Sequence, residues 1–124
     1  AVDRCTALLD SGKRLASAYN FRGLAYLKLD QPELAVQDFT DLVNGPGVKS
    51  THYTWNRARA YHAAGQDALA CADTAAALAA QSWRLSPDRQ ILACQARQDW
   101  VCPPVEEVDV FCLHVLAEAN ETGR

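Results

Sequence analysis

The side chains of this sequence that are best suited to chemistry are five cysteines and three histidines. His52 and His62 are ten residues apart on one expected helix, which separates them by about 15 Å along its axis. Cys112 and His114 are two residues apart, so on a helix they point in different directions. Because neither pair can share an ion, the sequence predicts no metal site.

The cysteines allow two interpretations. Their number is odd, so at least one has no partner within the monomer. The interpretation that we prefer is that most are small buried apolar residues. The alternative is one or two disulfides in an oxidising compartment. In that case we expect a bond between Cys94 and Cys102, because it would tie one helix to the start of the next across a short connection.

No other motif in the sequence is typical of an enzyme. The chain contains no Gly-rich phosphate loop, no His-Glu-x-x-His and no Gly-x-Ser-x-Gly. Glu106, Glu107 and Asp109 stand at the start of an expected helix, where the helix dipole favours negative charge, so a structural role explains them. We therefore expect a protein without catalysis and without a cofactor.

Composition further narrows the class of protein to which this chain can belong. A chain of 124 residues with 49% apolar residues suits one domain with a packed core. The net charge of -3 is too small to indicate an acidic or basic partner, and the scattered Lys and Arg argue against nucleic-acid binding. No apolar run approaches the roughly 20 residues that span a bilayer. The first residue is Ala1 rather than Met, so we expect that a native start was removed, and a missing signal peptide does not argue against secretion.

Helices must position the cysteines, histidines and acidic residues named above, because apolar residues recur with helical spacing along most of the chain. Pro32 and Pro87 suit the first turn of a helix, and the stretch 44–47 (Asn-Gly-Pro-Gly) is a strong stop signal. The pattern predicts helices over 1–10, 17–29, 33–43, 51–64, 67–81, 87–100 and 105–119, with a break at 11–15. No strand is predicted.

The sequence also repeats itself with a step of 35 residues. Residues 22–26 (Arg-Gly-Leu-Ala-Tyr) return at 57–61 (Arg-Ala-Arg-Ala-Tyr), and residues 35–39 return more weakly at 70–74. A period of this length indicates stacked helical units. Such a stack usually offers a binding surface rather than a reaction centre.

On these residues the chain resembles the tetratricopeptide repeat (TPR) family of antiparallel helix-pair solenoids. Residues 16–49 and 51–84 match as full repeats, 1–14 as the second helix of an earlier repeat, and 86–119 as a degenerate or capping helix pair. The segment 5–12 followed by 22–26 is similar to a bacterial subgroup with many periplasmic members. This resemblance implies a periplasmic or secreted protein, with a cytoplasmic location as the alternative.

The resemblance assigns structural roles to the residues that match its pattern. Small residues are expected where helices cross, and large residues are expected to fill the space within and between repeats. The small ones are Gly23, Ala35, Ala58 and Ala70, and the large ones are Tyr26, Phe39 and Tyr61. A large residue in place of Gly23 should overpack the crossing.

One departure from the family pattern occurs in both repeats. Arg22 and Arg57 replace an apolar residue, and each is followed 16 residues later by an aspartate, Asp38 or Asp73. We expect ion pairs between the helices that carry them, and the alternative is that these arginines bind a partner.

The resemblance also implies a binding surface on the concave side of the stack, lined by the first helix of each repeat. The residues at the lining positions are Asn20, Phe21, Leu24, Lys28, His52, Trp55, Asn56, Arg59 and His62. Trp55, Asn56 and Arg59 together form the best patch for a peptide, with a flat anchor, an amide and a cation. The alternative is that Trp55 packs against a neighbouring helix.

The function that follows is a non-catalytic scaffold that binds a protein or peptide. One alternative is a structural or oligomerisation module of a larger envelope protein, for example a homodimer. Another is an accessory subunit of an enzyme or of a secretion complex.

Overall fold

The computed structural model describes residues 2–10, 16–45, 50–80 and 85–121. Across these residues it contains seven helices and no strand, which confirms the predicted all-α class. The helices are α1 (Val2–Asp10), α2 (Ala16–Lys28), α3 (Pro32–Asn44), α4 (Thr51–Ala63), α5 (Asp67–Ala79), α6 (Pro87–Asp99) and α7 (Glu106–Glu121). Their bounds agree with the predicted ranges to within about two residues. The predicted break at 11–15 lies outside the described residues.

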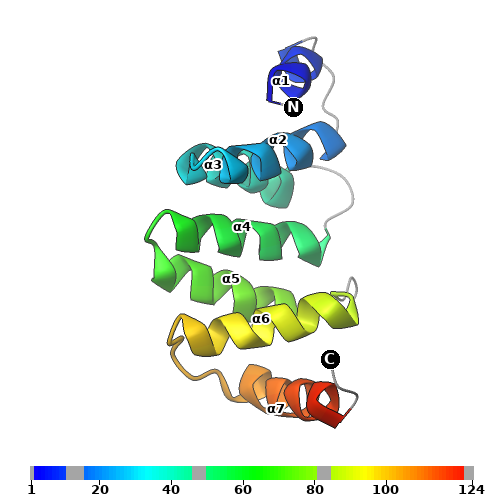
Figure 1. Cartoon of the computed structure of the whole chain (residues 1–124), viewed down its shortest axis with the longest axis vertical. Coiled ribbons are helices and arrows are strands. Elements are labelled where there is room, and N and C mark those ends of the chain that lie inside the picture. The colour runs from blue at the N-terminus through cyan, green and yellow to red at the C-terminus, as the bar shows by residue number, and fades with distance from the viewer. Residues whose placement is uncertain (1, 11–15, 46–49, 81–84, 122–124) are drawn as a thin grey trace.

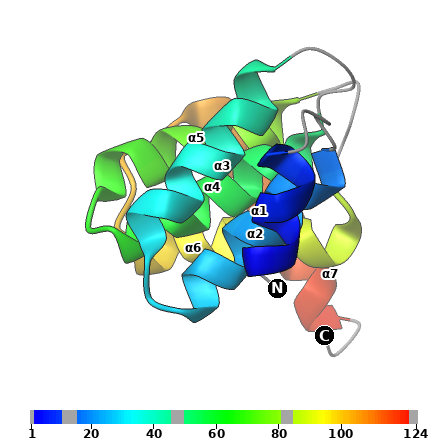
Figure 2. The same ribbon diagram turned by 90° about the horizontal axis from the view of Figure 1, so that it is seen from above.

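The helices follow one another along the long axis of the molecule, from α1 at one end to α7 at the other (Figure 1). Each helix packs mainly against its neighbours in sequence, and α2 also contacts α4 while α5 contacts α7. Seen along that axis, α3 and α5 lie on the opposite side from α2 and α6 (Figure 2). Each helix therefore has a small number of close neighbours, and any groove between helices is lined by helices that are close in sequence.

The helix starts follow from local sequence signals. Pro32 and Pro87 occupy the first turns of α3 and α6, where a missing N–H costs no hydrogen bond. Ser50 and Ser86 cap α4 and α6, and each side-chain oxygen accepts a backbone N–H at 3.4 Å.

The helices α2, α4 and α6 end in the same way. The chain turns through a residue in the left-handed region at Asp30, Gly65 and Val101, with φ of 57°, 79° and 54°. In each case the N–H of the next residue donates to the carbonyl five residues before it, at 2.9, 2.8 and 2.9 Å respectively. The steps between these positions are 65 − 30 = 35 and 101 − 65 = 36 residues. The repeating step therefore extends to the third helix pair, although the sequence match there is weak.

The core is divided along the stack, and each helix pair packs against the helix that follows it. Ala35, Phe39 and Leu42 of α3 cluster with Ala60 of α4 and with half-buried side chains of α2. Further along, side chains of α4 and α5 cluster with Leu85 and two alanines of α6. A helix pair thus forms a groove that the next helix fills.

The close crossing of α2 and α3 depends on Gly23. A Cβ atom at this position would lie 2.7 Å from Cε1 and from Cζ of Phe39, and Phe39 is fully buried. The other small residues that we expected at crossings, Ala35, Ala58 and Ala70, are also fully buried.

The expected ion pairs are confirmed. Arg22 Nη2 and Nε donate to the Asp38 carboxylate at 2.6 and 2.8 Å, and this bond raises the pKa of Arg22. Arg57 Nε and Nη2 donate to Asp73 at 2.7 and 2.9 Å. The guanidinium of Arg57 also lies 5.5 Å from the ring centre of Tyr61, which places one of the expected large residues beside the ion pair.

Four of the five cysteines form disulfides, so the preferred interpretation of most of them as unbonded apolar residues is wrong, and so is the expected bond between Cys94 and Cys102. Cys94 pairs with Cys112, and Cys102 pairs with Cys71. The reason lies in the packing, because α7 folds back onto α6 and brings Cys112 to Cys94, while the connection after α6 runs beside α5. The two disulfides thus tie α6 to α7 and the 100–105 connection to α5. Cys5 is buried and free.

Candidate functional site

The nine residues that we expected to line a binding surface fall into three groups. Trp55 and Asn56 are buried, and Asn20, Leu24 and His52 are half-buried. Those that remain exposed are Phe21, Lys28, Arg59 and His62. The structure therefore brings only part of the predicted surface into contact with solvent.

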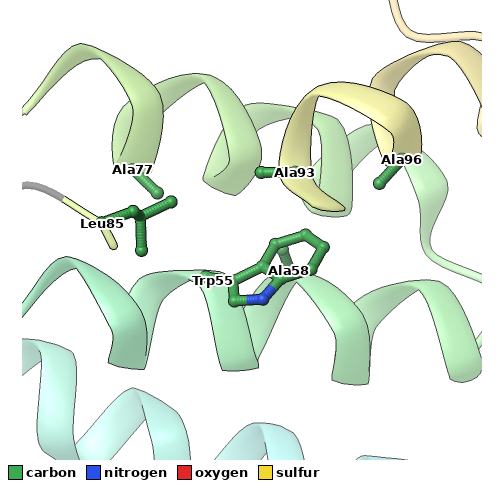
Figure 3. Packing of buried hydrophobic residues seen from close by; sticks show 6 residues of the cluster. All are labelled: Trp55, Ala58, Ala77, Leu85, Ala93 and Ala96. Carbon is green, nitrogen blue, oxygen red and sulfur yellow. The ribbon is translucent and has the colours of Figure 1, made fainter. Parts of the chain in front are cut away.

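Trp55 does not serve as an exposed anchor. Only 5% of its surface is accessible, and its indole lies beneath Ala93 and Ala96 of α6 (Figure 3). The alternative interpretation, in which this ring packs against a neighbouring helix, is the correct one. The physical reason is that α6 presents only small side chains here, so a large ring from α4 fills the space between the two helices.

A chain of hydrogen bonds runs across α2 and α4. Asn56 Nδ2 donates to Asn20 Oδ1 at 3.0 Å, and Asn56 Oδ1 accepts a bond from Arg59 Nη2. The guanidinium carbon of Arg59 also lies 5.7 Å from the ring centre of Trp55. The head of Arg59 is thus held by an amide and an aromatic ring, neither of which neutralises its charge.

Aromatic rings continue from Trp55 along the interface between α4 and α6. Trp100 stacks on Trp55, with ring centres 6.0 Å apart, and His62 stacks on Trp100 at 4.6 Å. His62 Nδ1 lies 2.8 Å from Asp67 Oδ1. This pairing orients the imidazole, so His62 is exposed but already has partners on both sides.

Arg89 of α6 completes a group of basic side chains, and we call Arg59, Arg89 and His52 the basic cluster. Desolvation, and then the positive charge of Arg89, lower the pKa of Arg59 and of His52. His52 Nδ1 lies 2.6 Å from Ser50 Oγ. Across the described part of the chain, neither Arg59 nor Arg89 has a carboxylate within ion-pair distance. The cluster is therefore a local excess of positive charge on a protein whose net charge is negative.

Comparisons of the chain with protein-family models, with characterised proteins and with solved structures gave no match. The site must therefore be interpreted from its own geometry.

Sequence reasoning missed Arg89 and Trp100. Both stand in the third helix pair, where the repeat match is weak, so their alignment with α4 could not be read from the repeat. The one signal that the sequence offered for α6 was Ser86 as a helix cap. It predicts where α6 begins, but not which of its faces packs against α4.

Three further observations concern the rest of the described residues. Over residues 2–10, 16–45, 50–80 and 85–121, no three His, Cys, Asp or Glu side chains gather as a metal-binding set. Nor does any helix in those ranges combine the length and the apolar character that crossing a bilayer requires. A small cavity of about 130 Å³ lies among Leu78, Leu85, Val108 and Phe111, between the last three helices.

Proposed function

We propose that this protein is a non-catalytic binding module of the TPR type, and that its basic cluster binds an acidic segment of a partner protein. Arg59 carries the proposal. It is exposed, its head is fixed by Asn56 and Trp55, it lies beside Arg89, and neither arginine has a carboxylate partner in the described structure.

Preorganisation makes such an arginine suitable for recognition. A guanidinium that is already oriented loses little side-chain entropy when a carboxylate binds it. Two neighbouring guanidinium groups repel each other, and an incoming carboxylate relieves that repulsion. Hydrogen bonds between charged groups contribute about 1.5–3 kcal/mol each, so a single acidic residue can dominate the contact.

The disulfides suggest where this binding takes place. Two bonds formed from four of the five cysteines are typical of proteins in an oxidising compartment. We therefore place the module in a periplasmic or secreted setting. A partner would meet it there as another envelope or secreted protein.

A peptide array tests the proposal. The labelled protein is applied to arrayed peptides of random sequence, and the bound peptides are ranked by affinity. We expect peptides rich in Asp and Glu to lead the ranking. In the double variant Arg59→Gln/Arg89→Gln, their binding should fall by at least about tenfold, since about 1.4 kcal/mol or more of interaction is lost.

The charge-matched control is Arg4→Gln, which removes one exposed cation from α1 and is compared with the single variant Arg59→Gln. This control should keep the ranking of the unaltered protein. The proposal is wrong if Arg59→Gln/Arg89→Gln retains the same peptides with the same affinity, or if the unaltered protein prefers neutral or basic peptides.

A further inference from the structure

The last helix pair has a groove that no described helix fills. Earlier in the stack, α4 packs against α2 and α3, and α6 packs against α4 and α5. Between α6 and α7, the two helices that lie at one end of the stack in Figure 1, there is a groove of about 520 Å³. We call it the end groove, and its main lining residues are Arg97, Val101, Asp109, Cys112, Leu113 and Leu116.

The rim of the end groove is apolar and exposed. Val101 and Leu113 are 85% and 70% accessible, the two highest values among the large apolar residues of the described chain. Val110, one turn before Leu113 on α7, is 49% accessible. A terminal helix that ended the stack in water would present a polar outer face, so this rim indicates a surface that is covered in use.

Val101 adds an independent sign of function. It occupies the left-handed region with φ of 54°, at the position where Gly65 ends α4. A β-branched residue is strained in this conformation, and burial offers no compensation because its side chain is exposed. The left-handed backbone at this position ends α6, but valine adopts it only under strain, and strained residues often cluster at binding surfaces.

The charges around the groove select the kind of partner. The helix α7 carries Glu106, Glu107, Asp109, Glu118 and Glu121, and it has no Lys or Arg. Among the described residues that line the groove, Arg97 is the only cation, and its side chain is buried, with 6% accessible. It is engaged by the Cys71 and Pro103 carbonyls and by Thr74, at 2.8–3.3 Å, and its Nε lies 3.7 Å from Asp109 Oδ1. The charge that α7 carries outside this ion pair is negative.

We infer that the end groove binds an amphipathic helix of a partner protein, with an apolar stripe flanked by Lys or Arg. A helix is the expected occupant because α4 and α6 fill the equivalent grooves of the first two pairs. Its apolar residues at i, i+3, i+4 and i+7 would cover Val101, Leu113 and Leu116. Its basic residues would lie against the acids of α7. Cys94–Cys112 holds the two walls together, so the groove is formed before the partner arrives.

Synthetic helices test this inference directly. The probe is a fluorescein-labelled peptide of about 18 residues built from Leu and Lys, with Leu at the spacing given above. Two reference peptides carry Glu in place of Lys, or the same composition in scrambled order. In anisotropy titrations, the Leu–Lys helix should bind at least about tenfold more tightly than either reference, a difference of about 1.4 kcal/mol.

Three variants of the full chain locate the site. Leu113→Lys should weaken binding by at least about tenfold, whereas Leu29→Lys should not change it. Leu29 is 59% exposed and directly follows α2, whereas the groove is lined by α6 and α7. Val101→Gly should raise the thermal midpoint, because glycine relieves the strain, and should still weaken binding through lost apolar contact. Circular dichroism checks that each variant is folded.

The inference is overturned if the scrambled or Glu peptide binds as tightly as the Leu–Lys helix, or if Leu113→Lys binds like the unaltered protein. It is also overturned if sedimentation shows a dimer that Leu113→Lys abolishes, since the occupant would then be a second copy of this chain. The outcome does not depend on Arg59 or Arg89, so it is separate from the test of the basic cluster.

Discussion

At the scale of single residues, Phe39 and Trp55 show how a large ring depends on small neighbours. Phe39 is fully buried because Gly23 leaves room for it, and Trp55 is buried because Ala93 and Ala96 do the same (Figure 3). In the second repeat, Thr74 stands where Phe39 stands in the first. The second pair therefore has no ring at this position, and its large ring, Trp55, fills the space between α4 and α6.

This dependence predicts the effect of adding one methyl group at Gly23. We expect Gly23→Ala to lower the free energy of unfolding by about 1–3 kcal/mol, because the new Cβ would lie 2.7 Å from the Phe39 ring. Urea denaturation measures the change. The double variant Gly23→Ala/Phe39→Leu supplies the control, and the alanine should cost clearly less in that background. An equal cost in both backgrounds would show that the ring is not the source of the strain.

Arg59 shows that the role of a polar side chain also depends on its neighbours. The sequence predicted a patch of ring, amide and cation, and the Arg59 side chain does contact both Asn56 and Trp55. Their roles differ from the prediction, because Trp55 and Asn56 are buried and hold the guanidinium group of Arg59 in place. Burial depends on the helix packed above, and a sequence pattern along α4 carries no information about α6.

At the scale of elements, the helices could be predicted because their signals are local. Pro32, Pro87 and the two serine caps mark starts, and apolar spacing marks the faces. The pairs Arg22–Asp38 and Arg57–Asp73 were also predictable, since the same spacing occurs twice. A third pair, Arg97 with Asp109 at 3.7 Å, has a spacing of 12 residues and could not be found by the same rule.

The disulfides could not be paired from sequence, because the pairing depends on how α7 and the connection before it fold back. Once known, they explain how the third helix pair is held. The side chains that α6 buries are Ala93, Cys94, Ala96 and Arg97, which provide little apolar area. Each covalent link adds about 2–4 kcal/mol, so the last pair depends more on its two bonds than the earlier pairs do on any single contact.

We therefore predict that removing one disulfide loosens the C-terminal end selectively. In Cys94→Ser/Cys112→Ser, backbone amides of α6 and α7 should exchange with deuterium faster, by the equivalent of about 2–4 kcal/mol in protection. Amides of α2 and α3 should keep their rates, because α7 packs mainly against α6 and α5. Hydrogen-exchange mass spectrometry resolves the two regions. An equal acceleration in α2 would mean that the molecule opens as one unit.

At the scale of the whole molecule, the two candidate binding surfaces differ. The basic cluster lies between α4 and α6, and the end groove lies between α6 and α7, so α6 contributes to both surfaces. The first surface is cationic and the second is apolar with acidic surroundings. A net charge of -3 hides both features, which is why composition alone indicated no preference for a partner.

The redox state of the five cysteines can be tested by counting free thiols in the whole chain. Four of the five cysteines form disulfides and Cys5 is 7% accessible. We predict that protein made in an oxidising compartment takes up almost no alkylating reagent while folded. After denaturation without reductant it should take up one label, and after reduction five, as read from the intact mass. Cys5→Ala should lose the single label, which identifies the free thiol. Five labels without reductant would contradict both disulfides, and three would show that only one of them forms.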